Sequence, residues 1–172
     1  PPASDTVTIE VKQNPTFANA GLNQTVCGAT FTSLTANTPT VGTGKWTVIS
    51  GSGNFTNDTD PNTTVTNLGL GLNSFRWTIS NPPCFPSSDD VNVLRLNPVI
   101  ANAGIDQTIC QDTVLLVGND PNDEGISKSW TQIAGTGSIF NTQSIQTQVA
   151  GLASGINRFV YSISEPGCPV SR

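Results

Sequence analysis

The chain has 172 residues, of which only 11% are charged, and its 12 acidic and 7 basic side chains give a formal net charge of −5. An acidic chain without a Lys/Arg cluster does not attract nucleic-acid phosphates, so nucleic acid is excluded as a partner. No apolar run approaches the roughly 18 residues of a membrane span. Average proteins carry about 25% charged residues, and their replacement here by Thr, Asn, Ser and Gly favours an extracellular β-protein.

Short segments rich in Val, Ile, Thr, Phe and Trp recur along the chain between Gly, Pro and Asn clusters, and the helical period is absent. The pattern predicts an all-β chain. Its predicted strands, in chain order, are Thr6–Val11, Gln24–Val26, Thr30–Thr35, Lys45–Ser50, Gly53–Thr56, Thr63–Leu68, Ser74–Ser80 and Val91–Leu96. The last seven are the number expected of an immunoglobulin-like β-sandwich.

The chain also contains two copies of one module in tandem, a pattern that decides the architecture before any single residue does. The offset is 83 residues in the first matching segment and 84 in the later ones. The matches are Ala18–Cys27 with Ala101–Cys110, Trp46–Gly53 with Trp130–Gly137, and Asn73–Ser80 with Asn157–Ser164. The fold class predicted is therefore two tandem immunoglobulin-like (PKD-like) modules.

The copies are out of phase with the ends of the chain, because Pro2–Asp5 aligns with Pro86–Asp89 at the end of a module. We divide the chain into 1–13, the last strand of a preceding repeat or a donor strand; 14–97, repeat 1; and 98–172, repeat 2 without its last strand. We expect a natural protein that is a longer array. In the alternative, segment 5–11 completes repeat 2 of a neighbouring molecule and builds a head-to-tail filament.

Alternating residues of the predicted strand Ser74–Ser80, and of its match in the second copy, define a core face, since successive strand residues point to opposite sides. A tryptophan in the third strand occupies the position that this fold buries. The predicted core residues are Trp46, Phe75, Trp77, Ile79, Trp130, Phe159, Tyr161 and Ile163.

Several motifs resemble those of a known family. They are an Ala-Asn-Ala-Gly-x-Asp-Gln-Thr run, a Trp-Thr-Gln strand, a Gly-x-Gly turn and a closing Asn-x-Phe-x-x-x-Ile, with Asp106–Thr108 and Trp130–Gln132 the most specific parts. The chain resembles the PKD/Ig-like repeats of large surface proteins, above all Bacteroidetes gliding and adhesion proteins. It lacks Trp-Asp-Phe-Gly-Asp-Gly, so the resemblance is to adhesin-type relatives. This implies export to the cell surface, and a role in an adhesin or its stalk.

Four cysteines occupy matched positions, and an even number in a secreted-looking chain favours disulfides. Bridges within repeats, Cys27–Cys84 and Cys110–Cys168, close loops of similar size. However, they would join turns at opposite poles of a sandwich, roughly 20 Å apart, whereas a disulfide needs Cα atoms within about 7 Å. We therefore favour an inter-repeat Cys27–Cys168 disulfide, with the two bridges within repeats kept as the alternative.

The sequence contains two further kinds of candidate site, one for calcium and one for O-glycosylation. The acidic loop with Asp120, Asp123 and Glu124 offers hard oxygen ligands for Ca²⁺, but its spacing is not that of an EF-hand and repeat 1 lacks the carboxylates. We interpret it as a solvated turn, with no metal or other cofactor, and keep calcium as the alternative. Thr6 and Thr113 follow Asp and precede Val, which resembles a Bacteroidetes O-glycosylation acceptor; an ordinary strand start is the alternative.

The chain has no His, no Gly-x-Ser-x-Gly and no paired carboxylates, so the constellations for acid–base or nucleophilic catalysis are missing and no enzyme is predicted. The leading hypothesis is a structural and adhesive segment of a long extracellular adhesin or filament, used in gliding or attachment. Its partners would be neighbouring repeats of the same chain, and surface glycans, a host or a substratum. The alternative is a carbohydrate-binding accessory module of a secreted polysaccharide-degrading enzyme.

Overall fold

The computed structural model describes residues 2–121 and 125–171. The chain divides into two compact units, Pro1–Leu96 and Asn97–Arg172. Within the described ranges every regular element is a strand, so no helix is present there that could cross a membrane. The predicted all-β fold is confirmed.

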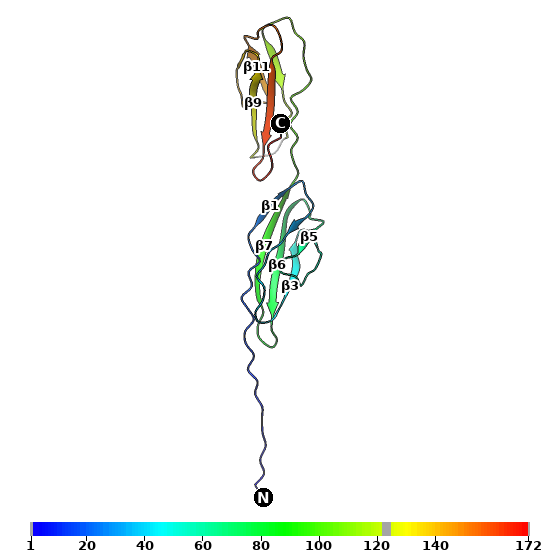
Figure 1. Ribbon diagram of the computed structural model, residues 1–172, viewed down its shortest axis with the longest axis vertical. Helices are drawn as coiled ribbons and strands as arrows, with labels where there is room; N and C mark the ends of the chain where they lie inside the picture. The colour runs from blue at the N-terminus through cyan, green and yellow to red at the C-terminus, as the bar shows by residue number, and fades with distance from the viewer. Residues whose placement is uncertain (1, 122–124, 172) are drawn as a thin grey trace. The chain divides into compact units, whose positions relative to one another are not determined.

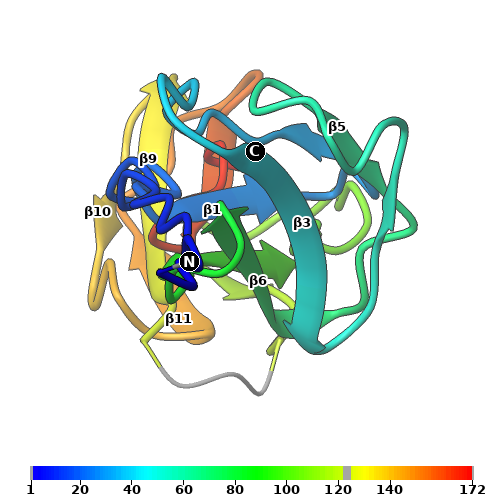
Figure 2. The ribbon, with the colours of Figure 1, turned by 90° about the horizontal axis from the view of Figure 1, so that it is seen from below.

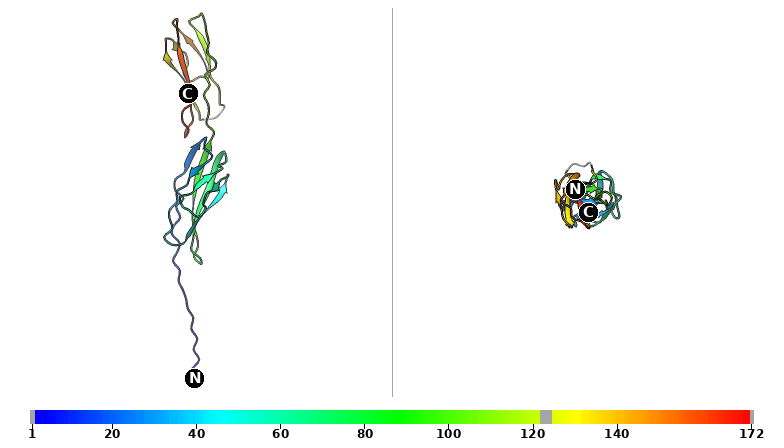
Figure 3. Two further views of the ribbon diagram at one scale, coloured as in Figure 1. Left: turned by 45° about the vertical axis from the view of Figure 1, so that its right-hand side comes forward. Right: turned by 90° about the horizontal axis from the view of Figure 1, so that it is seen from above.

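Unit 1 is a sandwich of two sheets (Figures 1 and 3). One sheet has the order β1-β7-β6-β3 and the other β2-β5-β4. Each of the seven strands overlaps one predicted from the sequence. Their bounds are β1 Gln24–Cys27, β2 Thr32–Ser33, β3 Thr43–Ser50, β4 Asn54–Phe55, β5 Thr64–Thr66, β6 Gly71–Ser80 and β7 Ser87–Leu96.

The core of unit 1 follows from the period of β6, in which buried and half-buried residues alternate. Phe75, Trp77 and Ile79 are fully buried. Trp46 enters from β3, with its ring centroid 5.1 Å from that of Trp77. The register of β3 against β6 shifts between Val48 and Ser50, and β3 curves along its length beside β6 (Figure 2). The antiparallel strands β3 and β6 thus supply the aromatic centre of the sandwich.

The first and last strands of unit 1 are direct neighbours and run parallel. Gln24 of β1 pairs with Val93 of β7, and the register continues to Cys27 beside Leu96. In the constant-type immunoglobulin arrangement the first strand lies in the opposite sheet. Here it has moved to the sheet that contains the last strand.

Within its described residues, unit 2 has strands that correspond to β2–β6 and none that corresponds to β1 or β7. β12 pairs with β9 in one sheet, and β10-β11-β8 form the other. Its core contains Trp130, Tyr161 and Ile163, whereas Phe159 is only partly buried. The bounds are β8 Val114–Val117, β9 Ser127–Ala134, β10 Ser138–Ile139, β11 Gln146–Ala150 and β12 Arg158–Ser164.

Phe159 differs from its counterpart Phe75 for a visible reason. In unit 1, Phe75 pairs across the sheet with Val91 of β7. Among the described residues of unit 2, the corresponding edge of β12 pairs only through a single bridge between Ile163 and Ser171. Without a neighbouring strand, that end of β12 stays partly open.

The strand predicted at Thr6–Val11 is not formed. These residues carry no regular secondary structure and are exposed. The alternation of Val7, Ile9 and Val11 is that of a strand, but a strand needs a hydrogen-bonding neighbour, and none of the described residues pairs with this segment.

Candidate functional site

A reciprocal asparagine pair fixes the start of each repeat. In unit 1, Asn19 N donates to Asn37 Oδ1 at 2.8 Å and Asn37 N donates to Asn19 O at 3.0 Å. Asn102 and Asn119 make the same two bonds in unit 2, at 2.7 and 3.0 Å. The second residue of each Ala-Asn-Ala-Gly run is therefore a structural clip.

A second repeated asparagine ties together two turns and, in unit 1, β7. Asn73 is fully buried, and its Oδ1 accepts from Ser52 N at 2.9 Å and Gly69 N at 3.2 Å. Its Nδ2 donates to the carbonyls of Gly69, Gly71 and Val93 at 2.9, 3.1 and 3.4 Å. Every polar atom of this side chain is thus satisfied, as burial requires.

Asn157, the counterpart of Asn73, makes fewer of these bonds. Its Oδ1 accepts from Thr136 N at 2.8 Å, and its Nδ2 donates to Ala153 O at 3.0 Å and Gly155 O at 3.4 Å. It is half-buried rather than fully buried. The same tie is therefore weaker in unit 2.

The two repeated tryptophans are structural. Trp46 Nε1 donates to Asp60 O and Trp130 Nε1 donates to Ser144 O, both at 3.1 Å. Both rings are buried, with 1 and 2% of their surface exposed. Each indole therefore packs in the core and also anchors a loop, and neither ring is available as a platform for a ligand.

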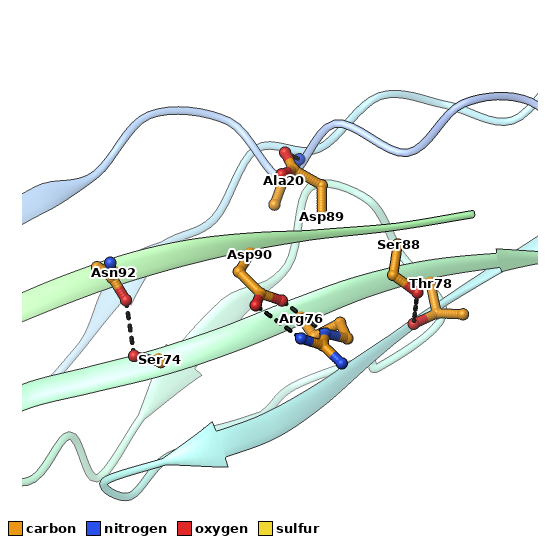
Figure 4. A network of polar contacts seen from close by, with 8 residues as sticks. All are labelled: Ala20, Ser74, Arg76, Thr78, Ser88, Asp89, Asp90 and Asn92. Atoms are coloured by element: carbon orange, nitrogen blue, oxygen red, sulfur yellow. Dashed lines mark hydrogen bonds and ion pairs between the residues drawn. The ribbon is translucent and has the colours of Figure 1, made fainter. Parts of the chain in front are cut away.

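Three polar cross-strand pairs line one face of β6 and β7 (Figure 4). Ser74 Oγ donates to Asn92 Oδ1 at 2.6 Å, and Thr78 and Ser88 share a hydroxyl bond of 3.0 Å. Between them the guanidinium of Arg76 makes two bonds to Asp90, of 2.7 and 2.8 Å. These groups lie directly opposite one another in the register, so each contributes to holding the strands together.

The central pair has a defined charge state. The hydrogen bond from Arg76 is the main cause that lowers the pKa of Asp90, and the same bond raises the pKa of Arg76. Both side chains are well exposed, so water screens their attraction. The pair orients the two strands more than it stabilises them.

The four cysteines divide into two classes. Cys27 and Cys168 are disulfide-bonded, whereas Cys84 and Cys110 are free thiols. The bridges Cys27–Cys84 and Cys110–Cys168 are therefore not formed. Their geometry explains why, because Cys27 lies at the end of β7 and Cys84 precedes its start, and ten strand residues span roughly 33 Å.

The acidic loop is only partly described. Asp123 and Glu124 lie outside the described residues. The carboxylate of Asp120 forms an ion pair with Lys128 Nζ at 2.6 Å. It therefore already has a cationic partner. Within the described residues no group of three or more metal-ligating side chains occurs. Nearby, burial raises the pKa of Tyr161, whose hydroxyl donates to Asn119 O at 3.0 Å.

The two candidate glycosylation threonines differ in accessibility. Thr6 is exposed and its amide donates to Asp5 Oδ1 at 2.8 Å. Thr113 is half-buried and precedes β8 directly. Only Thr6 therefore lies on a segment that a modifying enzyme can reach without disturbing a sheet.

Sequence reasoning did not assign the asparagine ties, although their signal is present. Asn73 and Asn157 open the matched Asn-x-Phe segments, and Asn19 and Asn102 lie in the doubled opening motif. An asparagine that recurs at the same position in both copies is the signal of a structural hydrogen bond. Some of their partners lie 17 to 21 residues away, and only the fold reveals these.

Comparison with known proteins identifies the fold. No protein-family model and no curated protein matches the chain. The first eight immunoglobulin domains of Down Syndrome Cell Adhesion Molecule match over 88% of this chain and 25% of theirs, with 10% identity and a TM-score of 0.54. The PKD domain from the KIAA 1837 protein matches over 56% of this chain and all of its own, with 19% identity and a TM-score of 0.44.

Insect hemolin matches over 96% of this chain and 47% of its own length, with 9% identity and a TM-score of 0.47. The chain thus spans a quarter to a half of these two multidomain structures. The topology, together with the likeness to the Down Syndrome Cell Adhesion Molecule domains, shows that the fold is an immunoglobulin-like β-sandwich.

Proposed function

We propose that this chain is a non-catalytic, load-bearing segment of an extracellular adhesin or surface filament, of the kind used by Bacteroidetes for gliding or attachment. The observation that carries the proposal is the parallel pairing of β1 with β7, the first and last strands of unit 1. Tension applied to the two ends of the unit enters β1 at Gln24 and leaves β7 at Leu96. Because the strands are parallel, this loads the whole ladder in shear, so its hydrogen bonds resist together.

The asparagine clips support the same role. They fasten the segment before β1 and the turns around β6 with side-chain bonds that recur in both units. Tandem domains with the same internal ties form a series of equivalent elements, which is the organisation that a stalk requires. The neighbouring repeats, and a surface or its glycans, are the proposed partners, and an extracellular location follows from this role and from the disulfide.

Single-molecule force spectroscopy tests the proposal. The reduced chain is pulled from its two ends, and we expect one unfolding event for each unit, each lengthening the chain by about 25 nm at roughly 3.5 Å per extended residue. Unit 1 should unfold at the higher force, because Gln107–Cys110 forms no strand in unit 2. A V26P variant, which disturbs the β1–β7 ladder, should lower only the higher force. Equal low forces for both units would contradict a load-bearing role.

A carbohydrate-binding accessory module is the second candidate, and one observation favours it. Four phenylalanines are exposed, namely Phe17, Phe31, Phe85 and Phe140, the last two by more than nine-tenths. Aromatic rings at a surface are the usual platforms for sugars. Binding on a glycan array that is lost in the F85A or F140A variant would support this candidate, and an array without binding would exclude it.

A further inference from the structure

The turn that contains Cys84 lies against the chain segment before repeat 1. Cys84 Sγ is 3.2 Å from Gln13 O and 3.7 Å from Lys12 O. Asn81 Nδ2 donates to the same Gln13 oxygen at 2.8 Å, and Cys84 N closes the turn on Asn81 O at 3.0 Å. The cysteine that follows β6 is therefore held at residue 13.

Cys168 occupies the same turn in unit 2, where its amide donates to Glu165 O at 3.1 Å. Donor and acceptor are three positions apart in the sequence in both turns. The turn of unit 1 thus shows that the cysteine after the sixth strand lies beside the segment that precedes the repeat, here Lys12 and Gln13.

Cys27 lies at the end of β1, directly beside Leu96. The two residues are partners in the β1–β7 register, and the next amide, Gly28 N, donates to Leu96 O at 3.0 Å. Leu96 matches Gln13 when the Asn-Pro dipeptides that follow are aligned, and it matches Lys12 when the strands before them are aligned. Both kinds of cysteine therefore contact the same position of the repeat, one from the module that ends there and one from the module that follows.

We propose that the cysteine after the first strand of each repeat pairs with the cysteine after the sixth strand of the next repeat. In this chain the pair is Cys27 with Cys168. Cys84 and Cys110 are the two open halves of the same joint, and the partner that each fits is a further repeat of this kind. This inference rests on the proposed role as a tandem array.

A second copy of this chain supplies such a repeat. Segment Thr6–Val11 has the alternation of β7: Val7 and Ile9 correspond to Val91 and Val93 at an offset of 84. Val7 and Ile9 are 85 and 81% exposed, whereas Val91 and Val93 are 1 and 0% exposed. The segment is a strand without a sheet, and it leads directly to Gln13 and Cys84.

The open edge of β12 is the place for that strand in the second copy. Beyond the Ile163–Ser171 bridge this edge pairs with no described residue. In the register of β7, insertion of Thr6–Val11 along β12 would place Lys12 next to Cys110, as Leu96 lies next to Cys27. Cys84 Sγ contacts the carbonyls of both Lys12 and Gln13, so Cys84 of one copy and Cys110 of the other then meet at this pair of residues.

Closing the joint is an oxidation. The thiols of Cys84 and Cys110 lose two protons and two electrons and form one S–S bond. A disulfide oxidant, such as oxidised glutathione, takes up the electrons and protons and is released as two thiols.

The experiment uses the whole chain in a glutathione redox buffer, analysed by non-reducing electrophoresis and peptide mapping. We expect a Cys27–Cys168 peptide within the monomer and a ladder of oligomers linked through Cys84–Cys110. The C84S and C110S variants should each remain monomeric alone, and their mixture should give a single dimer. A Cys27–Cys84 peptide, or dimers of each variant alone in yields matching the mixture, would overturn the proposal.

A matched control separates guided pairing from chance collision. The I9D variant keeps all four thiols and alters a side chain that is exposed in the monomer, but it blocks burial of the strand at β12. We expect at least a tenfold slower formation of the Cys84–Cys110 dimer, and an unchanged rate would overturn the strand-guided joint. These readouts are independent of force spectroscopy on the reduced chain, so a failed joint and a failed mechanical role are distinguishable.

Discussion

The N73A variant isolates the contribution of a fully buried side chain that makes five hydrogen bonds. Asn73 makes four hydrogen bonds of 2.9 to 3.2 Å and one of 3.4 Å while fully buried. Each net bond is worth about 1 kcal/mol. Ser52 is exposed and Gly69 half-buried, so their groups regain water in part. We expect unit 1 to lose about 3 kcal/mol of unfolding free energy.

The matched control is N157A in unit 2. Asn157 makes two bonds of 2.8 and 3.0 Å and one of 3.4 Å, from a half-buried position, so we expect a loss of about 1 kcal/mol. Urea unfolding followed by hydrogen exchange, resolved by peptides from each unit, reads the two separately. Equal losses at both sites, or a loss below about 1 kcal/mol for N73A, would refute the assignment of stability to this hydrogen-bond network.

A size-matched variant, N73D, separates donors from acceptors. The carboxylate still accepts from the amides of Ser52 and Gly69, but it faces the carbonyls of Gly71 and Val93 without a proton to donate. We expect the destabilisation to grow as pH rises and the buried group ionises. A loss independent of pH would show that the donated bonds contribute little.

Two further predictions concern the same sheet. A Cβ at Gly51, whose φ is +76°, would lie 2.4 Å from Asn73 Oδ1, so G51A should cost about 3 kcal/mol in urea unfolding, whereas G71A, with φ +85° and open space, should cost about 1; equal costs would contradict the steric reasoning. The pKa of Asp90 is lowered by Arg76 from 3.8, so its stabilisation is present above that value and is lost as pH falls through the folded-state pKa. Urea midpoints of D90N should therefore lie slightly below wild type at pH 7 and converge with it below about pH 4; a constant gap would exclude the ion pair as its cause.

The sequence was sufficient for the strands of unit 1 because their alternation is strong. In β6 the buried residues Phe75, Trp77 and Ile79 recur at every second position, and two registers of that segment would differ by its whole core face. The tandem repeat reinforced the prediction, since each pattern occurs twice. Local period and repetition together therefore predicted the fold class.

Features that depend on distant partners were beyond such reasoning. Thr6–Val11 has the period of a strand, but strand formation is decided by a neighbouring edge, and local sequence says nothing of that. Phe159 is only partly buried for the same reason, because its strand β12 has a single bridge on that edge among the described residues. The parallel partnership of β1 with β7 joins residues 69 positions apart, and no short-range signal distinguishes it from pairing with β2.

The ties that hold each repeat closed are made mostly by amides and hydroxyls. Asn19, Asn73, Asn102 and Asn157 act through neutral groups, and the chain has no His. Added salt shortens the Debye length from about 10 Å at 0.1 M to about 3 Å at 1 M, which weakens ion pairs but leaves neutral bonds nearly unchanged. The side-chain hydrogen bonds of these asparagines should therefore be nearly independent of ionic strength, whereas the Arg76–Asp90 pair weakens as salt is added.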